Sequence, residues 1–376
     1  MDFSLTEEQT AVRDLARKIL EDLATNDRLK EVEAADPVFD RKLWAELAKA
    51  NLLGVALPHE HGGDDMGFFT LCILLEEVGR SVAPVPVLAS LALGALPLAR
   101  FGSAEQQRRW LPAVARGEAI LTAALQEPGN DDATRPVSEA RRDGDDFVLN
   151  GEKTLVPAAQ LADALLVPAR TEDTGGALFL VEKDARGLTL EPQCVTDRQP
   201  YAALHLDGVR LPAAARVGPA GTDVLGWLAE HATVAICAVQ CGVSDRALQM
   251  TADYSRERIQ FERPIGSFQA VHQRAADAYI LLQALQLTAW QAALRLEAGQ
   301  PATDAVAVAK YWAAESGQKI GYACQHLHGG IGIDVDYPMH RYYLWAKQNE
   351  LCLGAAPVQL ERLGEHLASG SLISAD

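Results

Sequence analysis

The most informative stretch of the chain spans residues 256–269 and reads RERIQFERPIGSFQ. Three arginines, a Pro-Ile-Gly turn and two phenylalanines lie here, at the end of a helix predicted over 227–256. Guanidinium groups bind phosphate, and Phe261 and Phe268 would supply a packing edge, so the stretch could clamp an anion. A basic helix C-terminus followed by a corner explains the same residues, because cations suit that end of the helix dipole. The residues alone leave both interpretations open.

A second cluster, residues 325–332, reads QHLHGGIG. A Gly-Gly-x-Gly turn after a helix permits a ligand to approach the backbone closely, because no side chain intervenes. The alternative is an ordinary helix C-cap with an extra glycine. His326 and His328 are two residues apart and do not share a helix face, and no carboxylate lies at metal-site spacing. No metal site is predicted.

Working outward, long helical patterns dominate both ends of the chain. Beyond 227–256, helices are predicted over 267–298, 302–326 and 356–367, and long helices with short loops indicate an antiparallel bundle. Residues 2–117 also have a helical pattern, which Ser4-x-x-Glu7 opens as a predicted capping box.

The middle of the chain, residues 121–217, has short apolar runs separated by turn signals. Asn150-Gly151 predicts a hairpin turn and Asp207-Gly208 a second turn, so we expect a compact β barrel or sandwich. The fold class is therefore α+β: a helical domain over 1–120, a β domain over 121–217 and a helical bundle over 223–376. No GxGxxG follows a strand, which argues against a Rossmann dinucleotide site.

Composition excludes several other classes of protein. The 376 residues carry a formal net charge of −17, which leaves no basic excess for binding a nucleic-acid backbone. The six cysteines include no CxxC pair and indicate a reducing compartment. Prolines interrupt the apolar run 82–98, and no signal peptide is visible. We expect a soluble, cytoplasmic protein with neither nucleic-acid nor membrane partners.

Five segments, taken together and in order, resemble the acyl-CoA dehydrogenases. They are DFSLTEEQ (2–9), EPG (127–129), NGEK (150–153), the pattern RxQFxxPI (258–265) and HGGIG (328–332). The resemblance covers essentially the whole chain. It implies a helical N-terminal domain, a middle β barrel and a C-terminal four-helix bundle, usually in a tetramer. It also implies FAD, an acyl-CoA substrate dehydrogenated at Cα–Cβ, and an electron-transferring flavoprotein or similar acceptor.

In this family each FAD lies at a subunit interface, so one chain lends residues to the cofactor of its neighbour. The resemblance assigns Arg258 to the FAD pyrophosphate and the backbone of the glycine turn to close contact with the cofactor. Two positions depart from the family pattern, with Glu262 in place of glycine and His326 in place of glutamine. The cofactor-binding residues implied are Arg258, Gln260, Phe261, His326, Gly329, Gly330 and Gly332.

The catalytic base of the family has no obvious counterpart. The glutamate of the usual Tyr-Glu-Gly-Thr segment corresponds to Leu353, in CLGA over 352–355. Some members place the base at the start of the long helix, where Ala232 stands. Glu230 lies two residues earlier, about 200° around a helix, and is the candidate that remains.

The flavin-facing β segments depart from the pattern as well. QEPGNDDA over 126–133 replaces Thr-Glu-Pro-Gly-x-Gly-Ser-Asp, and Leu155-Val156-Pro157 replaces Trp-Ile-Thr. Proline supplies neither the hydroxyl nor an N–H donor. The residues that would bind the chain's own flavin are thus missing. Those that would bind the cofactor of a neighbouring chain are largely kept.

This asymmetry resembles the non-catalytic subunits of heteromeric acyl-CoA dehydrogenases, notably those for steroid side chains. The leading hypothesis is a subunit that completes the FAD site of a homologous, base-bearing partner in a heterotetramer. One alternative is a self-sufficient homotetramer with a displaced base. The other is a flavin-free scaffold or pseudoenzyme that binds acyl-CoA.

Overall fold

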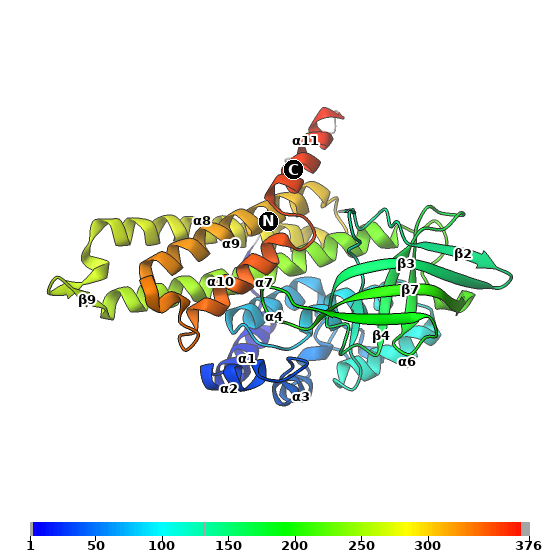
Figure 1. The fold of residues 1–376 in the computed structure, drawn as a ribbon, viewed down its shortest axis with the longest axis horizontal. Helices are drawn as coiled ribbons and strands as arrows, with labels where there is room; N and C mark the ends of the chain where they lie inside the picture. Colours follow the sequence, from blue (N-terminus) through cyan, green and yellow to red (C-terminus); the bar gives the residue numbers. More distant parts are fainter. Residues whose placement is uncertain (1–2, 131, 370–376) are drawn as a thin grey trace. The chain divides into compact units, whose positions relative to one another are not determined.

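The computed structural model describes residues 3–130 and 132–369. These form two compact units (Figure 1). Unit 1 contains residues up to 30, 72–83 and those from 233 onward, and unit 2 contains 31–71 and 84–232. The division into domains at 1–120, 121–217 and 223–376 stays a prediction.

Unit 2 begins with short helices, and capping side chains mark where two of them begin. The Asp40 carboxylate accepts hydrogen bonds from the N–H groups of Lys42 and Leu43 and so caps the first turn of α3. Ser103 and Gln106 form a reciprocal capping box at the start of α6. The helical elements lying wholly in this unit are α3 (Arg41–Lys49), η1 (Leu52–Gly54), η2 (His59–His61), the π-helix η3 (Leu88–Ala95), α5 (Leu96–Phe101), α6 (Ala104–Ala115) and η4 (Ala213–Ala215).

The β part of unit 2 consists of two four-stranded sheets. The first has the order β1-β4-β5-β8, in which β1 and β4 are parallel, and β4 is buried along its whole length. The second has the order β2-β3-β7-β6 and is antiparallel throughout. The strands are β1 (Leu121–Ala123), β2 (Glu139–Asp143), β3 (Asp146–Pro157), β4 (Ala164–Ala169), β5 (Ala177–Glu182), β6 (Leu188–Gln193), β7 (Tyr201–Pro212) and β8 (Arg216–Val217).

Both predicted turns in this region are wrong. Asn150-Gly151 and Asp207-Gly208 lie inside β3 and β7, where they face each other across a β-bulge. The Gly208 N–H donates to the Asn150 Oδ1 at 2.9 Å, and a Cβ at Gly151 would collide with Ser138. Turn-forming residues here bend a continuous pair of strands, because pairing along the sheet outweighs the local turn preference.

Unit 1 contains most of the long helices, and the expected bundle is confirmed. α2, α4 and α7 each contain residues of both units. The predicted capping box at Ser4 and Glu7 is wrong, since Thr6 and Gln9 form it two residues further on. The helices are α1 (Glu7–Leu23), α2 (Asn26–Glu33), α4 (Gly67–Arg80), α7 (Val224–Glu257), α8 (Gln269–Glu297), α9 (Thr303–His328), α10 (Met339–Leu351) and α11 (Ala356–Ala368).

α4 and α7 pack backbone to backbone within unit 1. A Cβ at Gly79 would collide with the carbonyl of Val239, and one at Gly242 with the carbonyl of Glu76. Two glycines therefore permit this close crossing. Among the described helices, α7 alone is long and apolar enough to cross a membrane, but 78% of its most apolar segment is buried.

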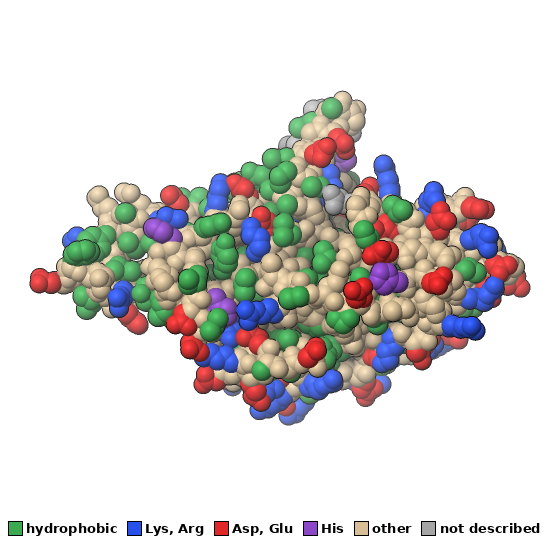
Figure 2. Space-filling view, viewed as in Figure 1, with side chains coloured by type: hydrophobic (Ala, Val, Ile, Leu, Met, Phe, Trp, Pro, Cys, Tyr) green, Lys and Arg blue, Asp and Glu red, His purple; other side chains and the backbone are tan. Residues whose placement is uncertain are grey.

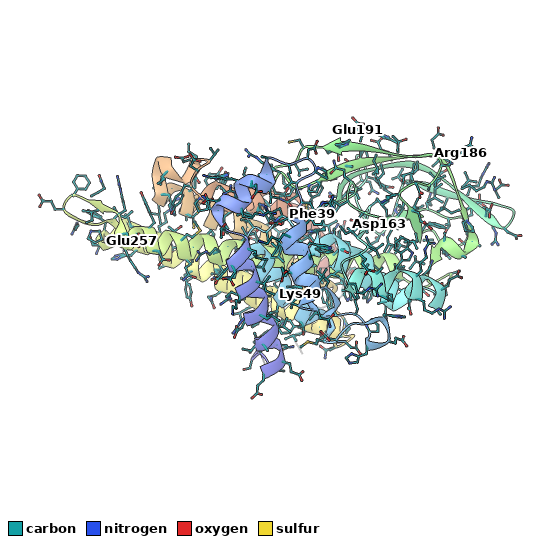
Figure 3. The ribbon with its side chains drawn as sticks, turned by 90° about the horizontal axis from the view of Figure 1, so that it is seen from below. Phe39, Lys49, Asp163, Arg186, Glu191 and Glu257 are labelled. Carbon is teal, nitrogen blue, oxygen red and sulfur yellow. The ribbon has the colours of Figure 1, made fainter. Side chains whose placement is uncertain are left out.

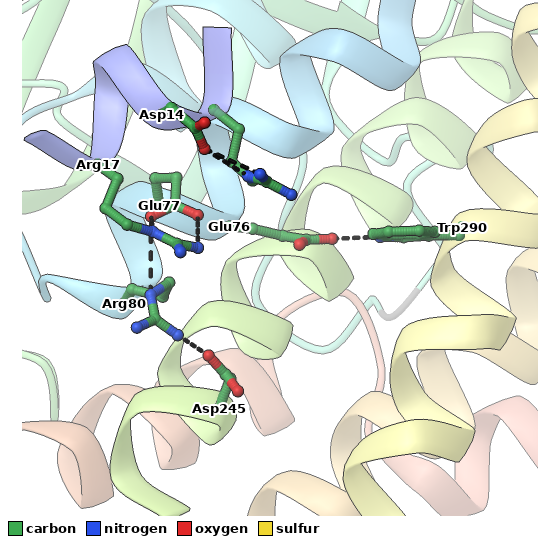
Figure 4. A network of polar contacts seen from close by, with 8 residues as sticks. Asp14, Arg17, Glu76, Glu77, Arg80, Asp245 and Trp290 are labelled. Atoms are coloured by element: carbon green, nitrogen blue, oxygen red, sulfur yellow. Dashed lines mark hydrogen bonds and ion pairs between the residues drawn. The ribbon is translucent and has the colours of Figure 1, made fainter. Parts of the chain in front are cut away.

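A polar network connects α1, α4 and α7 in unit 1 (Figure 4). Arg17 donates two hydrogen bonds to the Glu77 carboxylate, at 2.7 and 2.9 Å, and Arg80 bridges Glu77 to Asp245. The neighbouring Glu76 accepts a hydrogen bond from the indole N–H of Trp290 on α8. Burial raises the pKa of Glu76 to about 8, against the opposing effect of the Trp290 hydrogen bond.

The contribution of Glu76 to stability should therefore fall as pH rises from about 5 to 8. Glu76 stays protonated in the folded chain over this range but ionises on unfolding, so ionisation favours the unfolded state by up to about 1.4 kcal/mol per pH unit. Glu76→Gln should remove this slope, measured as the free energy of unfolding in denaturant at several pH values. The exposed Glu365→Gln is the control. An unchanged slope in Glu76→Gln would contradict the assignment.

Candidate cofactor-binding site

The arginine-rich stretch forms a hairpin between α7 and α8. Strands β9 (Ile259–Gln260) and β10 (Arg263–Pro264) pair antiparallel, and Phe261 and Glu262 connect them with φ of +53° and +66°. Two successive left-handed residues are typical of a type I′ turn, which normally selects Asn-Gly. Phe261 is 87% exposed, and Arg258 and Gln260 are also exposed. The hairpin thus presents a cation, an amide and an aromatic ring to its surroundings.

Glu262→Gly should stabilise the chain by about 0.5–1 kcal/mol, because glycine adopts the left-handed conformation without strain. Ala252→Gly, inside α7, is the control and should destabilise the chain by about 1 kcal/mol. The free energy of unfolding in denaturant measures both. Destabilisation by Glu262→Gly would mean that the turn is not strained.

Side-chain contacts hold the Phe268 ring in place beside the hairpin. The Arg263 guanidinium lies 4.0 Å from the ring centroid of Phe268, and Phe261 meets Phe268 edge-on at 6.1 Å. A cation–π contact of this kind contributes about 0.5–1 kcal/mol at an exposed site. Arg256 pairs with Asp253, whereas Arg258 makes no ion pair within residues 3–130 and 132–369. The Arg258 guanidinium can therefore bind an external anion.

The glycine cluster follows directly after α9, as the short helix η6 (Gly329–Ile333). Gly329 has φ of +64°, and a Cβ on it or on Gly330 would meet only open space, so the backbone here is accessible. A Cβ on the buried Gly332 would press against His328 and Gln325. Gly329 and Gly330 thus offer open backbone, while Gly332 permits the turn to pack.

One aromatic contact joins the two clusters. Tyr254, one turn before Arg258, stacks on His328 with ring centroids 4.5 Å apart. His328 is buried and its Nδ1 bonds to the Cys324 carbonyl, whereas His326 is exposed. Burial lowers the pKa of His328, which keeps the ring neutral at pH 7. The ends of α7 and α9, with the predicted cofactor-binding residues, therefore lie together.

Sequence reasoning expected Phe268 to supply a packing edge, but it did not find Tyr254 as a support of this site or His328 as its centre. The available signals were the i, i+4 spacing of Tyr254 and Arg258, and the position of His328 next to Gly329.

The loop after α10 contains the position of the family's base. Leu353 has φ of +54° and supplies no proton-accepting side chain. The buried Lys310 on α9 donates to the carbonyls of Asn349 and Glu350, at 2.9 and 3.0 Å. Gln359 donates to the carbonyls of Leu353 and Gly354. Hydrogen bonds thus fix the conformation of this loop, but the residue at the position of the family's catalytic base is leucine.

The Leu353 loop and the cofactor cluster lie far apart in unit 1. Lys310, which holds the end of α10 just before the loop, is separated from His328 by most of α9, or about 27 Å at 1.5 Å per residue. One chain therefore presents these two regions at different places along its bundle.

Comparison with known proteins decides the family. Profiles of the acyl-CoA dehydrogenase N-terminal, middle and C-terminal domains match residues 6–118, 123–209 and 220–368. The chain belongs to the acyl-CoA dehydrogenase family. It is thus an enzyme of the flavoprotein oxidoreductases that act on the CH–CH bond of acyl-CoA thioesters, and the predicted fold is confirmed.

Several relatives match along almost the whole chain. Acyl-CoA dehydrogenase FadE27 of Mycobacterium tuberculosis is 43% identical, with 98% of this chain and 99% of the relative covered. The ChsE4-ChsE5 complex from M. tuberculosis matches with a TM-score of 0.93 and 42% identity over 98% of this chain and 99% of the other. A variant of the Tcur3481-Tcur3483 steroid ACAD matches with a TM-score of 0.92 and 47% identity over 97% and 99%.

The β segments that face the flavin in acyl-CoA dehydrogenases satisfy their polar groups internally here. The Leu155 N–H donates to Gln193 at 2.8 Å, and the Pro157 carbonyl accepts a hydrogen bond from Thr122 at 2.7 Å. The Asn130 side chain bonds to Glu127 and to the N–H of Asp132, while Asp131 lies outside the described residues. Among the described residues of these segments, the Leu155 N–H, the Pro157 carbonyl and the Asn130 side chain are thus already paired within the chain.

The other usual position of the catalytic base in acyl-CoA dehydrogenases, near the start of the long helix, is occupied here by Ala232. α7 already runs through residues 230–232, so Glu230 points about 200° away from the fully buried Ala232. His231 between them stacks on Trp227 at 3.7 Å and lies 4.7 Å from Phe68. Burial lowers the pKa of His231 to about 4, so the ring is neutral at pH 7. Glu230 stays a prediction.

Proposed function

We propose that this chain is the non-base-bearing subunit of a heteromeric acyl-CoA dehydrogenase. It completes the FAD site of a homologous partner that carries the glutamate, in a heterotetramer with two copies of each chain. The supporting observation is the contrast within this chain. The cluster around Arg258 and Gly329 is exposed and available, whereas the segments at Leu155 and Pro157 are internally paired and position 353 is leucine.

The exposed cluster fits the cofactor. Arg258 would neutralise the pyrophosphate, Phe261 and Gln260 would contact the cofactor, and the open backbone at Gly329 and Gly330 would let it approach closely. His326 and Gly332 belong to the same proposed site. Bound FAD would supply the acceptor for the hydride that leaves Cβ. The α-proton would be removed by the partner's glutamate, because this chain holds no carboxylate at either usual base position.

The surface of unit 1 supports a partner subunit. Large apolar side chains are exposed along α8 and α9, and Figure 2 shows apolar side chains over the bundle helices. Exposed apolar surface of this kind marks interaction sites. The residues are Tyr279, Ile280, Leu287 and Tyr322, which are 56%, 65%, 48% and 53% exposed.

The substrate and acceptor complete the proposal. Two of the similar structures are a complex of two proteins and a steroid ACAD, which favours a steroid side-chain thioester of CoA as substrate. An electron-transferring flavoprotein is the proposed acceptor. A cytoplasmic location is proposed because none of the six cysteines forms a disulfide.

Turnover of acyl-CoA with a dye acceptor, measured for each chain and for the copurified complex, tests the proposal. Activity should require both chains. Turnover by this chain alone that Glu230→Gln abolishes would instead establish a self-sufficient homotetramer. A complex that binds acyl-CoA but never contains flavin would establish the scaffold.

A further inference from the structure

The first cluster of the candidate cofactor site is fixed to the last turns of α7. The Arg258 N–H donates to the Tyr254 carbonyl at 2.8 Å, and the Ile265 N–H donates to the Arg258 carbonyl at 2.8 Å. These two bonds close the base of the hairpin onto the turn that carries Tyr254. Figure 3 labels Glu257, the last residue of α7, from which the hairpin extends.

The second cluster is fixed to the end of α9 by His328. This histidine is the last residue of the helix, directly before the open backbone of Gly329 and Gly330. The buried Gly332 packs against it, since a Cβ on Gly332 would lie 3.0 Å from the Cβ of His328. The position of the His328 side chain therefore sets where the glycine turn lies.

The His328 ring contacts two tyrosine rings. Tyr254 stacks on it, with ring centroids 4.5 Å apart and an angle of 20° between the planes. Tyr337, in the loop before α10, meets it at 5.3 Å, and the tyrosine hydroxyl lies 3.2 Å from Nε2 of the histidine. Because Tyr254 and His328 each anchor one cluster, their stack fixes the hairpin relative to the glycine turn.

The hydrogen bonds of His328 fit a neutral ring. Its Nδ1 carries a proton, because the Cys324 carbonyl 2.8 Å away can only accept. Nε2 can then accept the proton of the Tyr337 hydroxyl. A second ring proton would point at that hydroxyl, which would have to turn away. Since His328 is only 4% exposed, water cannot solvate a charged ring in this position.

No charge next to His328 compensates for protonation of its ring. Among the residues that the structure describes, no carboxylate forms an ion pair with it. Burial therefore outweighs the Cys324 hydrogen bond and lowers the pKa of His328. The titratable and charged groups near the ring or near its partner Tyr337 are Tyr254, Arg246, Asp253 and Glu257 on α7, Cys324 on α9 and His340 on α10.

We propose that Tyr254 and His328 are positioning residues for the cofactor: their stack, with the histidine uncharged, holds Arg258 and the Gly329 backbone in the arrangement that binds FAD. This inference rests on the proposed function, since it assumes that the two clusters bind the cofactor of a partner. Protonation of His328 should loosen the stack, so FAD affinity should fall as pH drops below about 6.5, by at most about tenfold per pH unit.

Titration of the flavin-stripped, copurified complex with FAD, followed by flavin fluorescence, tests the stack. Tyr254→Ala should raise the Kd for FAD about tenfold or more, because the ring that fixes the hairpin to the glycine turn is lost. Tyr254→Phe keeps the ring and should stay within about threefold of the unmodified complex. Affinity in Tyr254→Phe no better than in Tyr254→Ala would overturn the proposal, and so would unchanged affinity in both.

The same titration at several pH values tests the uncharged ring. His328→Phe keeps a ring that cannot gain a proton. Between pH values of about 7.5 and 5, the Kd of the unmodified complex should rise at least about threefold more than that of His328→Phe. His366→Gln is the matched control, because His366 bonds to Asp304 at the opposite end of α9, and it should keep the unmodified pH profile. Equal rises in the unmodified complex and in His328→Phe would overturn the proposal.

Arg258→Ala separates this proposal from the proposed function. If Arg258→Ala weakens FAD binding and Tyr254→Ala does not, the chain still completes the site of its partner and only the positioning role is wrong. If Arg258→Ala leaves FAD binding unchanged, the proposed function fails, and the positioning role fails with it. Native mass shows whether each variant complex assembles. Should Tyr254→Ala not assemble, the pH comparison with His328→Phe decides.

Discussion

Arg258→Ala should strip FAD from the proposed heteromeric complex and abolish its turnover. The guanidinium is exposed, makes no ion pair among the described residues, and is proposed to bind the cofactor pyrophosphate. Each charge-assisted hydrogen bond lost costs about 1.5–3 kcal/mol, so a bidentate contact is worth roughly 10²–10⁴ in affinity. Flavin absorbance relative to protein after gel filtration, and dehydrogenase turnover of the same sample, measure the effect.

Arg256→Ala provides the matched control. Arg256 is also exposed and lies two residues away, but it pairs with Asp253 and has no proposed role at the cofactor. The complex with Arg256→Ala should keep its flavin. Normal flavin occupancy in the complex with Arg258→Ala would contradict the proposal that the cluster around Arg258 and Gly329 binds FAD.

Lys153→Met should destabilise the chain by about 3–5 kcal/mol, the largest expected effect on folding. Lys153 is fully buried and its ammonium lies 2.6 Å from the buried Glu127 carboxylate. That carboxylate also accepts hydrogen bonds from the N–H groups of Val137 and Ser138, at 2.6 and 2.8 Å. Removing the lysine leaves a buried charge without its counterion. Unfolding in denaturant measures the loss.

Two further variants separate this effect from simple loss of a side chain. The double variant Lys153→Met with Glu127→Gln should recover part of the stability, because no uncompensated charge remains. Arg109→Gln breaks the exposed pair with Glu182 and should cost at most about 1 kcal/mol. A loss for Lys153→Met no larger than for Arg109→Gln would contradict the importance of the buried pair.

The Lys153–Glu127 pair should also make the stability of the chain depend on pH under acidic conditions. Burial by itself raises the pKa of Glu127, but the hydrogen bonds from Lys153, Val137 and Ser138 outweigh it and lower the pKa to about 2. A carboxyl with a depressed folded pKa contributes stability above its unfolded pKa, near 4.5. This contribution should fade as pH falls from about 4.5 towards 2, and Glu127→Gln should remove that part of the acid dependence.

The sequence predicted the long helices well because no proline interrupts them over 34, 29 and 26 residues. α7, α8 and α9 were expected within a few residues of their observed ends. α10 was not predicted, since its sequence MHRYYLWAKQNEL has no amphipathic pattern and most of its burial comes from bundle packing. The turn signals at Asn150 and Asp207 failed because strand pairing over the full length of β3 and β7 converts them into a bulge.

The candidate site was predicted only in its parts. Local motifs located Arg258 and Gly329 separately, but the Tyr254–His328 stack that joins them depends on how α7 and α9 pack. No local pattern shows that the Gln193 side chain accepts a hydrogen bond from the Leu155 N–H, because the two residues are distant in sequence and meet only in the folded sheet. Contacts of this kind follow from tertiary structure alone.

The most direct test is the flavin absorbance and native mass of this chain purified alone and with its base-bearing partner. We expect a colourless protein alone, and a yellow heterotetramer with one FAD per pair of unlike chains once the partner is present. A yellow homotetramer of this chain alone, with stoichiometric FAD, would contradict it.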